Sequence, residues 1–270
     1  IQSAEKETTM TTTLSDVGQD LYNNLTARTF YVIDTEFCTV DDEHHIISLA
    51  IRPILGGRRT TASQVFHAIM NPGDPIADTT SGIHGFTDAD VKRKKPFNHY
   101  ARVIAARLNE PDAIFVCHST IDAHVLRREF ERLDEQAANG EQGITAGLAD
   151  WPLLPVLDTM KAAQAASYPN APRSAKVSLD RLCDLTNTSR TKNAHDARED
   201  ARATANALIE VLRHTAQHSI HWTYESFHEL ASGGTTHEPN GPAHLKPRNK
   251  PHIPPPPEHV ARHIYPLLAP

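Results

Sequence analysis

The chain has 270 residues, 39% of them apolar, and a formal net charge of −6. This length and apolar content suffice for one large or two small domains with a sizeable core. The acidic balance excludes a protein that coats duplex DNA through a broadly basic surface. It does not exclude a site in which bound metal ions neutralise acidic side chains.

The cysteines are few and widely spaced, at Cys38, Cys117 and Cys183. An odd count without C-x-x-C spacing argues against a disulfide framework and a structural zinc site, and is typical of a reducing compartment. No apolar stretch approaches the roughly 18 residues that span a bilayer. We expect no signal peptide, because the first residues lack its basic-then-apolar pattern. We therefore expect a cytoplasmic protein without a membrane partner.

The apolar residues concentrate between about Thr29 and Leu212. This distribution predicts one globular domain over residues 28–231, preceded by a partly flexible leader over 1–27. Met10 is the expected native start, so residues 1–9 are excluded from the fold. Residues 232–270 form a Pro- and His-rich tail, and such a composition favours an extended chain over a packed core.

Three runs of β-branched and aromatic residues come first, at 29–33, 46–54 and 64–70. Short turns join them, so we expect an antiparallel meander. Alternating helices and strands follow, which predicts a mixed sheet flanked by helices. The expected later strands are 113–117 and 156–158, and the expected helices are one opened by a capping box at Thr87 and Asp90, 97–108, 122–133, 158–166, 179–185 and 196–213.

Two carboxylates stand at the expected end of the first strand, in Asp34-Thr35-Glu36. Alternate residues of a strand point to the same face, so Asp34 and Glu36 are predicted neighbours. Their repulsion is costly unless a cation lies between them, and a hard divalent ion prefers oxygen ligands. On its own so short a motif is more often a solvent-facing strand end.

Two further acids stand near junctions of strands and helices. Asp122 follows the fourth strand, in His118-Ser119-Thr120-Ile121-Asp122, where α/β sites collect their ligands. A simpler interpretation makes Asp122 the N-cap of the next helix, a contribution of about 1 kcal/mol. Asp200 lies five residues after His195 near the start of the last helix, where an acid is also stabilised by the helix dipole.

The ordered set Asp34, Glu36, Asp122, His195 and Asp200 resembles the DEDDh (DnaQ-like) family of 3′→5′ exonucleases, which includes the bacterial proofreading subunit, ribonuclease T and the Trex enzymes. Similar segments extend the resemblance over about residues 29–212, and they look closest to the bacterial DNA polymerase proofreading (epsilon subunit) branch. These segments are Asn71-Pro72, Ile83-His84-Gly85-Phe86-Thr87-Asp88, Leu157-Asp158-Thr159 and Ser178-Leu179-x-x-Leu182-Cys183.

The resemblance implies a ribonuclease H-like α/β fold, with a mixed five-stranded sheet between helices in three α/β/α layers. One motif departs from the family pattern. Ser119 and Ile121 stand where the family usually has Asn and Phe. The departure concerns substrate contacts more than metal binding, because Asp122 is retained.

The resemblance also implies a mechanism with two Mg²⁺ or Mn²⁺ ions about 4 Å apart. As a hypothesis, Asp34 bridges both ions, and Glu36 and Asp200 bind the ion nearer the attacking water. Asp122 reaches the other ion through water. The imidazole of histidine titrates near neutral pH, so His195 is the expected acceptor of the water proton.

The expected reaction releases nucleoside 5′-monophosphates from 3′ ends of single-stranded nucleic acid, with DNA favoured over RNA. The backbone around Thr35, together with Glu36, is expected to meet the 3′-OH. An apolar or aromatic face can pack on any terminal base; for Phe37 and Ile83, core packing is the alternative. His118 either contacts a phosphate or caps its strand. The candidate substrate-binding residues are Thr35, Phe37, Ile83, His84 and His118.

Three rival functions remain open at this point. One is a noncatalytic nucleic-acid-binding module of the same fold. Another is an RNA-trimming exoribonuclease of the same family, since discrimination of the 2′-OH depends on pocket contacts. The third is a metal-dependent phosphodiesterase for small nucleotides. Expected partners are single-stranded 3′ ends, with a DNA polymerase or another replication or repair protein as a further candidate.

Overall fold

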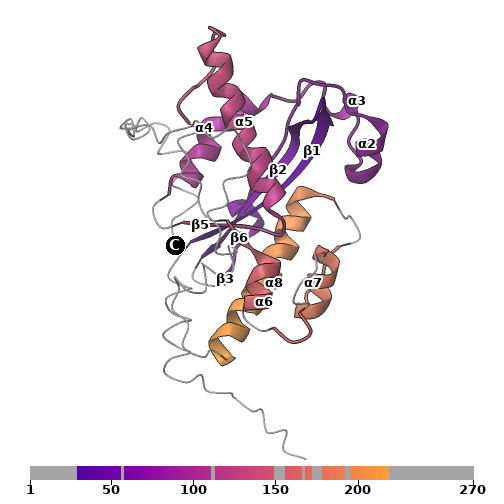
Figure 1. The fold of residues 1–270 in the computed structure, drawn as a ribbon, viewed down its shortest axis with the longest axis vertical. Coiled ribbons are helices and arrows are strands. Elements are labelled where there is room, and N and C mark those ends of the chain that lie inside the picture. The colour runs from indigo at the N-terminus through magenta and orange to yellow at the C-terminus, as the bar shows by residue number, and fades with distance from the viewer. Residues whose placement is uncertain are drawn as a thin grey trace, which may run out of the picture.

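The computed structural model describes residues 29–55, 58–110, 113–148, 156–165, 168–171, 178–191 and 195–218. In this part of the chain a mixed sheet lies between helices (Figure 1). The predicted leader (1–27) and tail (232–270) lie outside the described residues, so the domain boundaries stay predictions.

The strands occupy five positions in the order β3-β2-β1-β5-β6, and β4 shares the edge position with β3 because both pair with β2. β1 is antiparallel to β2 and parallel to β5, and β5 is parallel to β6. The predicted meander and mixed five-position sheet are confirmed. The bounds are β1 (Phe30–Val40), β2 (Glu43–Leu55), β3 (Arg58–Arg59), β4 (Phe66–Ile69), β5 (Ile114–Cys117) and β6 (Leu157–Asp158).

The helices follow the predicted order, with one addition. The capping box at Thr87 and Asp90 opens α3, as the sequence indicates. Helix α2 was not predicted: none of its seven described residues is buried, so it has no apolar repeat. No helix in the described ranges combines the length and apolarity needed to cross a membrane. The bounds are α2 (Asp78–His84), α3 (Asp88–Val91), α4 (Phe97–Leu108), α5 (Thr120–Ala138), α6 (Thr159–Ala165), α7 (Leu179–Thr186) and α8 (Ala197–His218).

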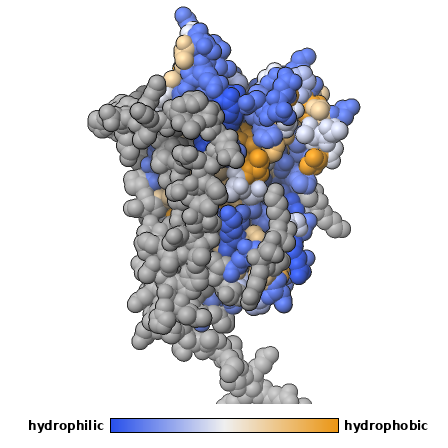
Figure 2. All heavy atoms as spheres, viewed as in Figure 1, coloured by the Kyte–Doolittle hydropathy of each residue, from blue (hydrophilic) through white to orange (hydrophobic). Residues whose placement is uncertain are grey.

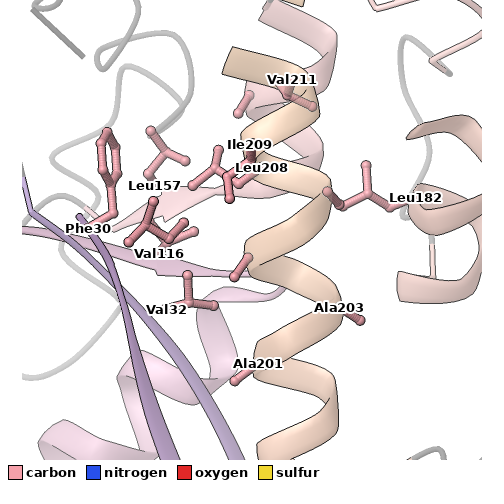
Figure 3. Close-up of a cluster of buried hydrophobic side chains, with 14 of the residues drawn as sticks. Phe30, Val32, Val116, Leu157, Leu182, Ala201, Ala203, Leu208, Ile209 and Val211 are labelled. Atoms are coloured by element: carbon pink, nitrogen blue, oxygen red, sulfur yellow. The ribbon is translucent and has the colours of Figure 1, made fainter. Parts of the chain in front are cut away.

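Alternate residues of β1 face two different helix layers. Phe30 and Val32 pack in a buried cluster with α6, α7 and α8 (Figure 3). Tyr31 and Ile33 pack on the other face with α4 and α5. A fully buried apolar side chain contributes about 1.5–3 kcal/mol, so both faces fix the position of β1. By the same alternation, Asp34 and Glu36 share the α8 face and Thr35 the α5 face.

The first strand is longer than predicted. It continues through Asp34 and Glu36 to Val40, because β2 pairs with it along its whole length. Among the described strands, β5 pairs with β1 only over Phe30–Val32. Asp34 and Glu36 therefore lie inside a strand, not at its end. Beyond Ile33, however, one side of β1 is open where the shorter β5 has ended.

Helix α5 is fixed to β2 through a buried acid. Glu129 accepts a hydrogen bond from the backbone N–H of Ile46 at 2.8 Å and pairs with Arg132, also at 2.8 Å. Arg128 and Arg132 both reach Glu43 at the start of β2. These contacts hold the helix whose first turn carries Asp122.

Candidate active site

The acids from β1 meet the start of α8. Glu36 is 7% exposed and Asp200 4% exposed, whereas Asp34 is half-buried. The Asp196 side chain begins α8 by accepting hydrogen bonds from the N–H groups of Arg198 and Glu199. This cap places Asp200 in the first turns of α8, on the sheet face that carries Asp34 and Glu36.

Asp122 reaches the same place from the opposite helix layer. Its Oδ1 accepts hydrogen bonds from the backbone N–H of Thr35 at 2.9 Å and from the Thr35 hydroxyl at 2.7 Å. Because β5 has ended before this point, Asp122 takes the place of a strand partner. The N-cap of α5 is Ser119, whose Oγ accepts from the N–H of Ile121. The alternative interpretation of Asp122 as the N-cap is therefore wrong.

Burial and the charges of neighbouring acids raise the pKa of Asp34, Glu36 and Asp122. Burial, followed by the nearby Asp122, Asp200 and Glu36, raises the pKa of Asp34 well above its ordinary value. Burial, followed by Asp200, Asp122 and Asp196, raises the pKa of Glu36 from 4.5 to about 8. For Asp122 burial raises the pKa to about 6, although the Thr35 hydrogen bonds oppose it. The site therefore favours an added cation.

One arginine already offsets part of this charge. Arg190 makes a bidentate pair with Asp200. Its Nε donates to Oδ1 at 2.8 Å and its Nη2 donates to Oδ2 at 2.5 Å. Its Nη1 also donates to Asp180 of α7 at 2.7 Å. Arg190 lies in the segment after α7 and lowers the pKa of both Asp34 and Glu36. The sequence prediction did not include it, because no motif marks this position.

The donor set fits a divalent metal ion. One ligand atom each of Glu36, His195 and Asp200 lies within 4.8 Å of the others. His195 is exposed, and its backbone N–H donates to Asp200 Oδ2 at 3.1 Å. Its φ of 66° is in the left-handed region, which a residue other than Gly seldom adopts. Carboxylate oxygens suit hard divalent ions and an imidazole nitrogen suits softer ones, so this set fits a divalent ion without selecting one.

Helix α2 places two of the predicted substrate-binding residues beside this cluster. Ile83 is 55% exposed, so its alternative interpretation as a core residue is wrong. Figure 2 shows hydrophobic atoms on the upper right lobe, where Figure 1 labels α2 and α3. Burial and then the nearby His195 lower the pKa of His84. Helix α2 also contacts β1, the strand that carries Asp34 and Glu36. His84 Nδ1 accepts from the N–H of Phe86 at 3.1 Å.

The other predicted substrate-binding residues, Phe37, His118 and Thr35, make packing contacts or hydrogen bonds within the protein. Phe37 is half-buried and packs against the α5-side core, and its ring centroid lies 4.7 Å from that of His44 in a tilted arrangement. His118 Nδ1 is hydrogen bonded to Thr159 Oγ1 at 3.0 Å. Asp122 accepts from both donors of Thr35, so Thr35 can meet a substrate only as an acceptor, through its carbonyl or hydroxyl oxygen.

Comparison with known proteins identifies the family. A family model described as Exonuclease (RNase_T) matches residues 31–208. That span contains all four clustered acids and His195, in the order Asp, Glu, Asp, His, Asp. The chain belongs to the DEDDh family of exonucleases. Residues 31–208 are accordingly an exonuclease domain of a metal-dependent family, with a ribonuclease H-like fold.

The chain is also similar to individual proteins, over parts of their length or at low sequence identity. A DNA polymerase III subunit epsilon-like protein of Rhodobacter capsulatus is 35% identical over 108 residues, which is 37% of this chain and 14% of that protein. The nuclease domain of 3′hExo, a DEDDh family member bound to rAMP, is 12% identical with a TM-score of 0.54, over 73% of this chain and 97% of that one. A zinc-bound E. coli ExoI–ssDNA complex is 17% identical with a TM-score of 0.52, over 66% and 39%.

We predict that the metal-free protein loses stability as pH rises. The pKa of folded Glu36 is raised from 4.5 to about 8, so the folded chain binds more protons than the unfolded chain between these values. The stability from this proton is complete below pH 4.5 and is lost as pH rises to about 8. Urea unfolding in EDTA should give a lower free energy at about pH 8.5 than at about pH 6.

The variant Glu36→Gln should flatten this dependence, because its amide does not titrate. The exposed Glu141 lies outside the cluster, so Glu141→Gln should keep the wild-type slope. A wild-type free energy of unfolding that stays level or rises over this range would contradict the charge strain in the site.

Proposed function

We propose that this chain is a two-metal-ion 3′→5′ exonuclease that hydrolyses the terminal phosphodiester bond of single-stranded DNA and releases nucleoside 5′-monophosphates. The observation that carries the proposal is the convergence of Asp34, Glu36, Asp122 and Asp200 at the open side of β1. Burial and the neighbouring acids raise the pKa of Asp34, Glu36 and Asp122, a cost that binding of nucleic acid alone would not require. The noncatalytic module is therefore the weaker alternative.

The four carboxylates would hold two divalent ions, Mg²⁺ or Mn²⁺. When bound, such ions lower the pKa of a coordinated water and stabilise the oxygen that leaves the phosphorus. Burial and the charges of Asp122, Asp200 and Glu36 all raise the pKa of Asp34, and we propose it as the carboxylate that both ions would share. Asp122 is held in place by Thr35, so its orientation is fixed before any metal arrives.

His195 is proposed as the general base. Its backbone is tied to Asp200, and a ring nitrogen lies within 4.8 Å of ligand atoms of Glu36 and Asp200. A neutral imidazole there can accept the proton of the attacking water. Because His195 is exposed, the proton can then pass to solvent from the same ring.

Helix α2 is proposed to receive the terminal nucleotide. Ile83 offers an exposed apolar surface for the base, a contact that tolerates any sequence. His84 Nδ1 accepts a hydrogen bond from the N–H of Phe86, so the neutral ring carries its hydrogen on Nε2. That Nε2 is buried without a hydrogen-bond partner among the described residues. It can donate to a phosphate oxygen of a bound chain end.

The preference for DNA rests on the epsilon-like name of the Rhodobacter capsulatus relative, which also makes a DNA polymerase a proposed partner. The second candidate is an exoribonuclease of the same family. The observation in its favour is the rAMP bound to the 3′hExo domain of similar fold. Both candidates use the same acids, so the choice between them depends on contacts with the sugar.

We predict laddering from the 3′ end when 5′-labelled single-stranded DNA is incubated with the protein and Mg²⁺ or Mn²⁺. Asp34→Ala should abolish the ladder because the shared carboxylate is lost. His195→Ala should lower kcat by about 100- to 10,000-fold, the usual contribution of a general base. His99→Ala, at an exposed position of α4, is the matched control and should keep wild-type activity.

The same time course on single-stranded RNA compares the rates at which the protein degrades the two candidate substrates. Faster RNA degradation would replace the DNA assignment by the exoribonuclease. A folded wild-type protein that degrades neither polymer with either metal would overturn the proposed function. Unchanged turnover of His195→Ala would overturn the role of that residue alone.

We further predict that Ile83→Ala raises KM for a single-stranded oligonucleotide and leaves kcat nearly unchanged. An apolar contact of about 1 kcal/mol corresponds to about a fivefold rise in KM. The side chain is 55% exposed, so its truncation should not destabilise the fold. Thr79→Ala, at an exposed position of the same helix, is the control. Equal KM values for the two variants would exclude Ile83 from the binding surface.

A further inference from the structure

The carboxylate of Asp200 already accepts three hydrogen bonds. Arg190 donates from Nε to Oδ1 and from Nη2 to Oδ2, and the backbone N–H of His195 donates to Oδ2. An ionised carboxylate has about four lone-pair sites. Among the donors of the described residues, therefore, one site remains for a further partner, and it is on Oδ1.

The two hydrogen bonds from Nε and Nη2 of Arg190, the guanidinium fork, occupy the edge of the Asp200 carboxylate that lies between its two oxygens. Its two arms span both oxygens, one lone pair on each, in the bidentate geometry that arginine makes with carboxylates. A metal ion that binds both oxygens of a carboxylate must approach the same edge. With Arg190 in place, Asp200 can offer an ion one oxygen but not two.

We propose that Arg190 is a metal-selectivity residue, which keeps Asp200 a one-oxygen ligand and thereby favours Mg²⁺ and Mn²⁺ over Ca²⁺. The inference rests on the metal centre of the proposed function. Mg²⁺ requires near-octahedral geometry with few protein ligands, whereas Ca²⁺ accepts six to eight oxygens and often takes carboxylates through both. Arg190 is thus a positioning residue, and it acts on the ion through Asp200.

The third nitrogen of the guanidinium, Nη1, is bound outside the cluster of Asp34, Glu36, Asp122 and Asp200. Nη1 of Arg190 donates to Asp180, a residue of α7 whose side chain is 67% exposed, whereas the Arg190 side chain is 10% exposed. The fork is therefore held from two helices, because Asp180 lies on α7 and Asp200 on α8. A lysine at position 190 keeps the charge, but its single ammonium cannot span both oxygens of Asp200.

Variants of Arg190 can test separately its two effects on Asp200, the orientation of the carboxylate and the positive charge beside it. Isothermal titration calorimetry on the full chain, with MgCl2, MnCl2 and CaCl2 in turn, gives Kd for each ion without any substrate. Wild type, Arg190→Lys, Arg190→Met and the control Asp180→Asn are compared, and thermal melts in EDTA establish that each is folded. The measured quantity is the ratio of the Kd for Ca²⁺ to the Kd for Mg²⁺.

We expect both Arg190 variants to lower this ratio by about tenfold or more, the scale on which partners of metal ligands affect affinity. Asp180→Asn leaves the fork on Asp200 intact and should keep the wild-type ratio. If Arg190→Met does not fold, Arg190→Lys alone decides, because it retains the positive charge beside the buried acid.

Two results would overturn the inference. If Arg190→Lys keeps the wild-type ratio and Arg190→Met tightens all three ions equally, Arg190 acts only through its charge. If every variant keeps the ratio, Arg190 has no part in selectivity, and the metal centre still stands. Absence of divalent-ion binding to wild type would overturn the proposed metal centre and this inference together.

Discussion

The mutual repulsion of four carboxylates is the constraint on which the rest of this site depends. The central strand β1 and two helices bring Asp34, Glu36, Asp122 and Asp200 together. Burial and the charges of neighbouring acids raise the pKa of Asp34, Glu36 and Asp122. The fold offsets a part of the cost with neutral donors from Thr35 and a part with the guanidinium of Arg190. The remainder requires protonation or a bound cation, and at neutral pH a divalent cation is the more effective of the two.

The unequal lengths of the central strands make this convergence possible. β1 runs to Val40 against β2, but β5 leaves it after Val32. Two acids of β1 face α8, and the space beside Thr35 is filled by an acid from α5 on the opposite side of the sheet. A longer β5 would bond the Thr35 N–H itself and exclude Asp122. The short strand therefore lets both helix layers contribute ligands to one centre.

Much of this arrangement could be predicted from the sequence, because the acids coincide with strong local patterns. Buried β-branched runs lead into Asp34 and precede Asp122, and a helix-start pattern precedes Asp200. The extension of β1 could not be predicted, since it depends on pairing with β2 rather than on its own residues. Helix α2 has no apolar repeat to reveal it. Arg190 meets Asp200 only in the folded chain, and a single arginine between two helices has no sequence signature.

The central claim is that the four acids form one two-ion metal centre, and crystals of the full chain soaked in MnCl2 test it most directly. Anomalous difference density at the manganese edge should show two peaks about 4 Å apart among Asp34, Glu36, Asp122 and Asp200. In crystals of Asp34→Ala both peaks should weaken or disappear, because that carboxylate is the proposed shared ligand. Ordered carboxylates without any peak at saturating Mn²⁺, or peaks only elsewhere on the molecule, would contradict the claim.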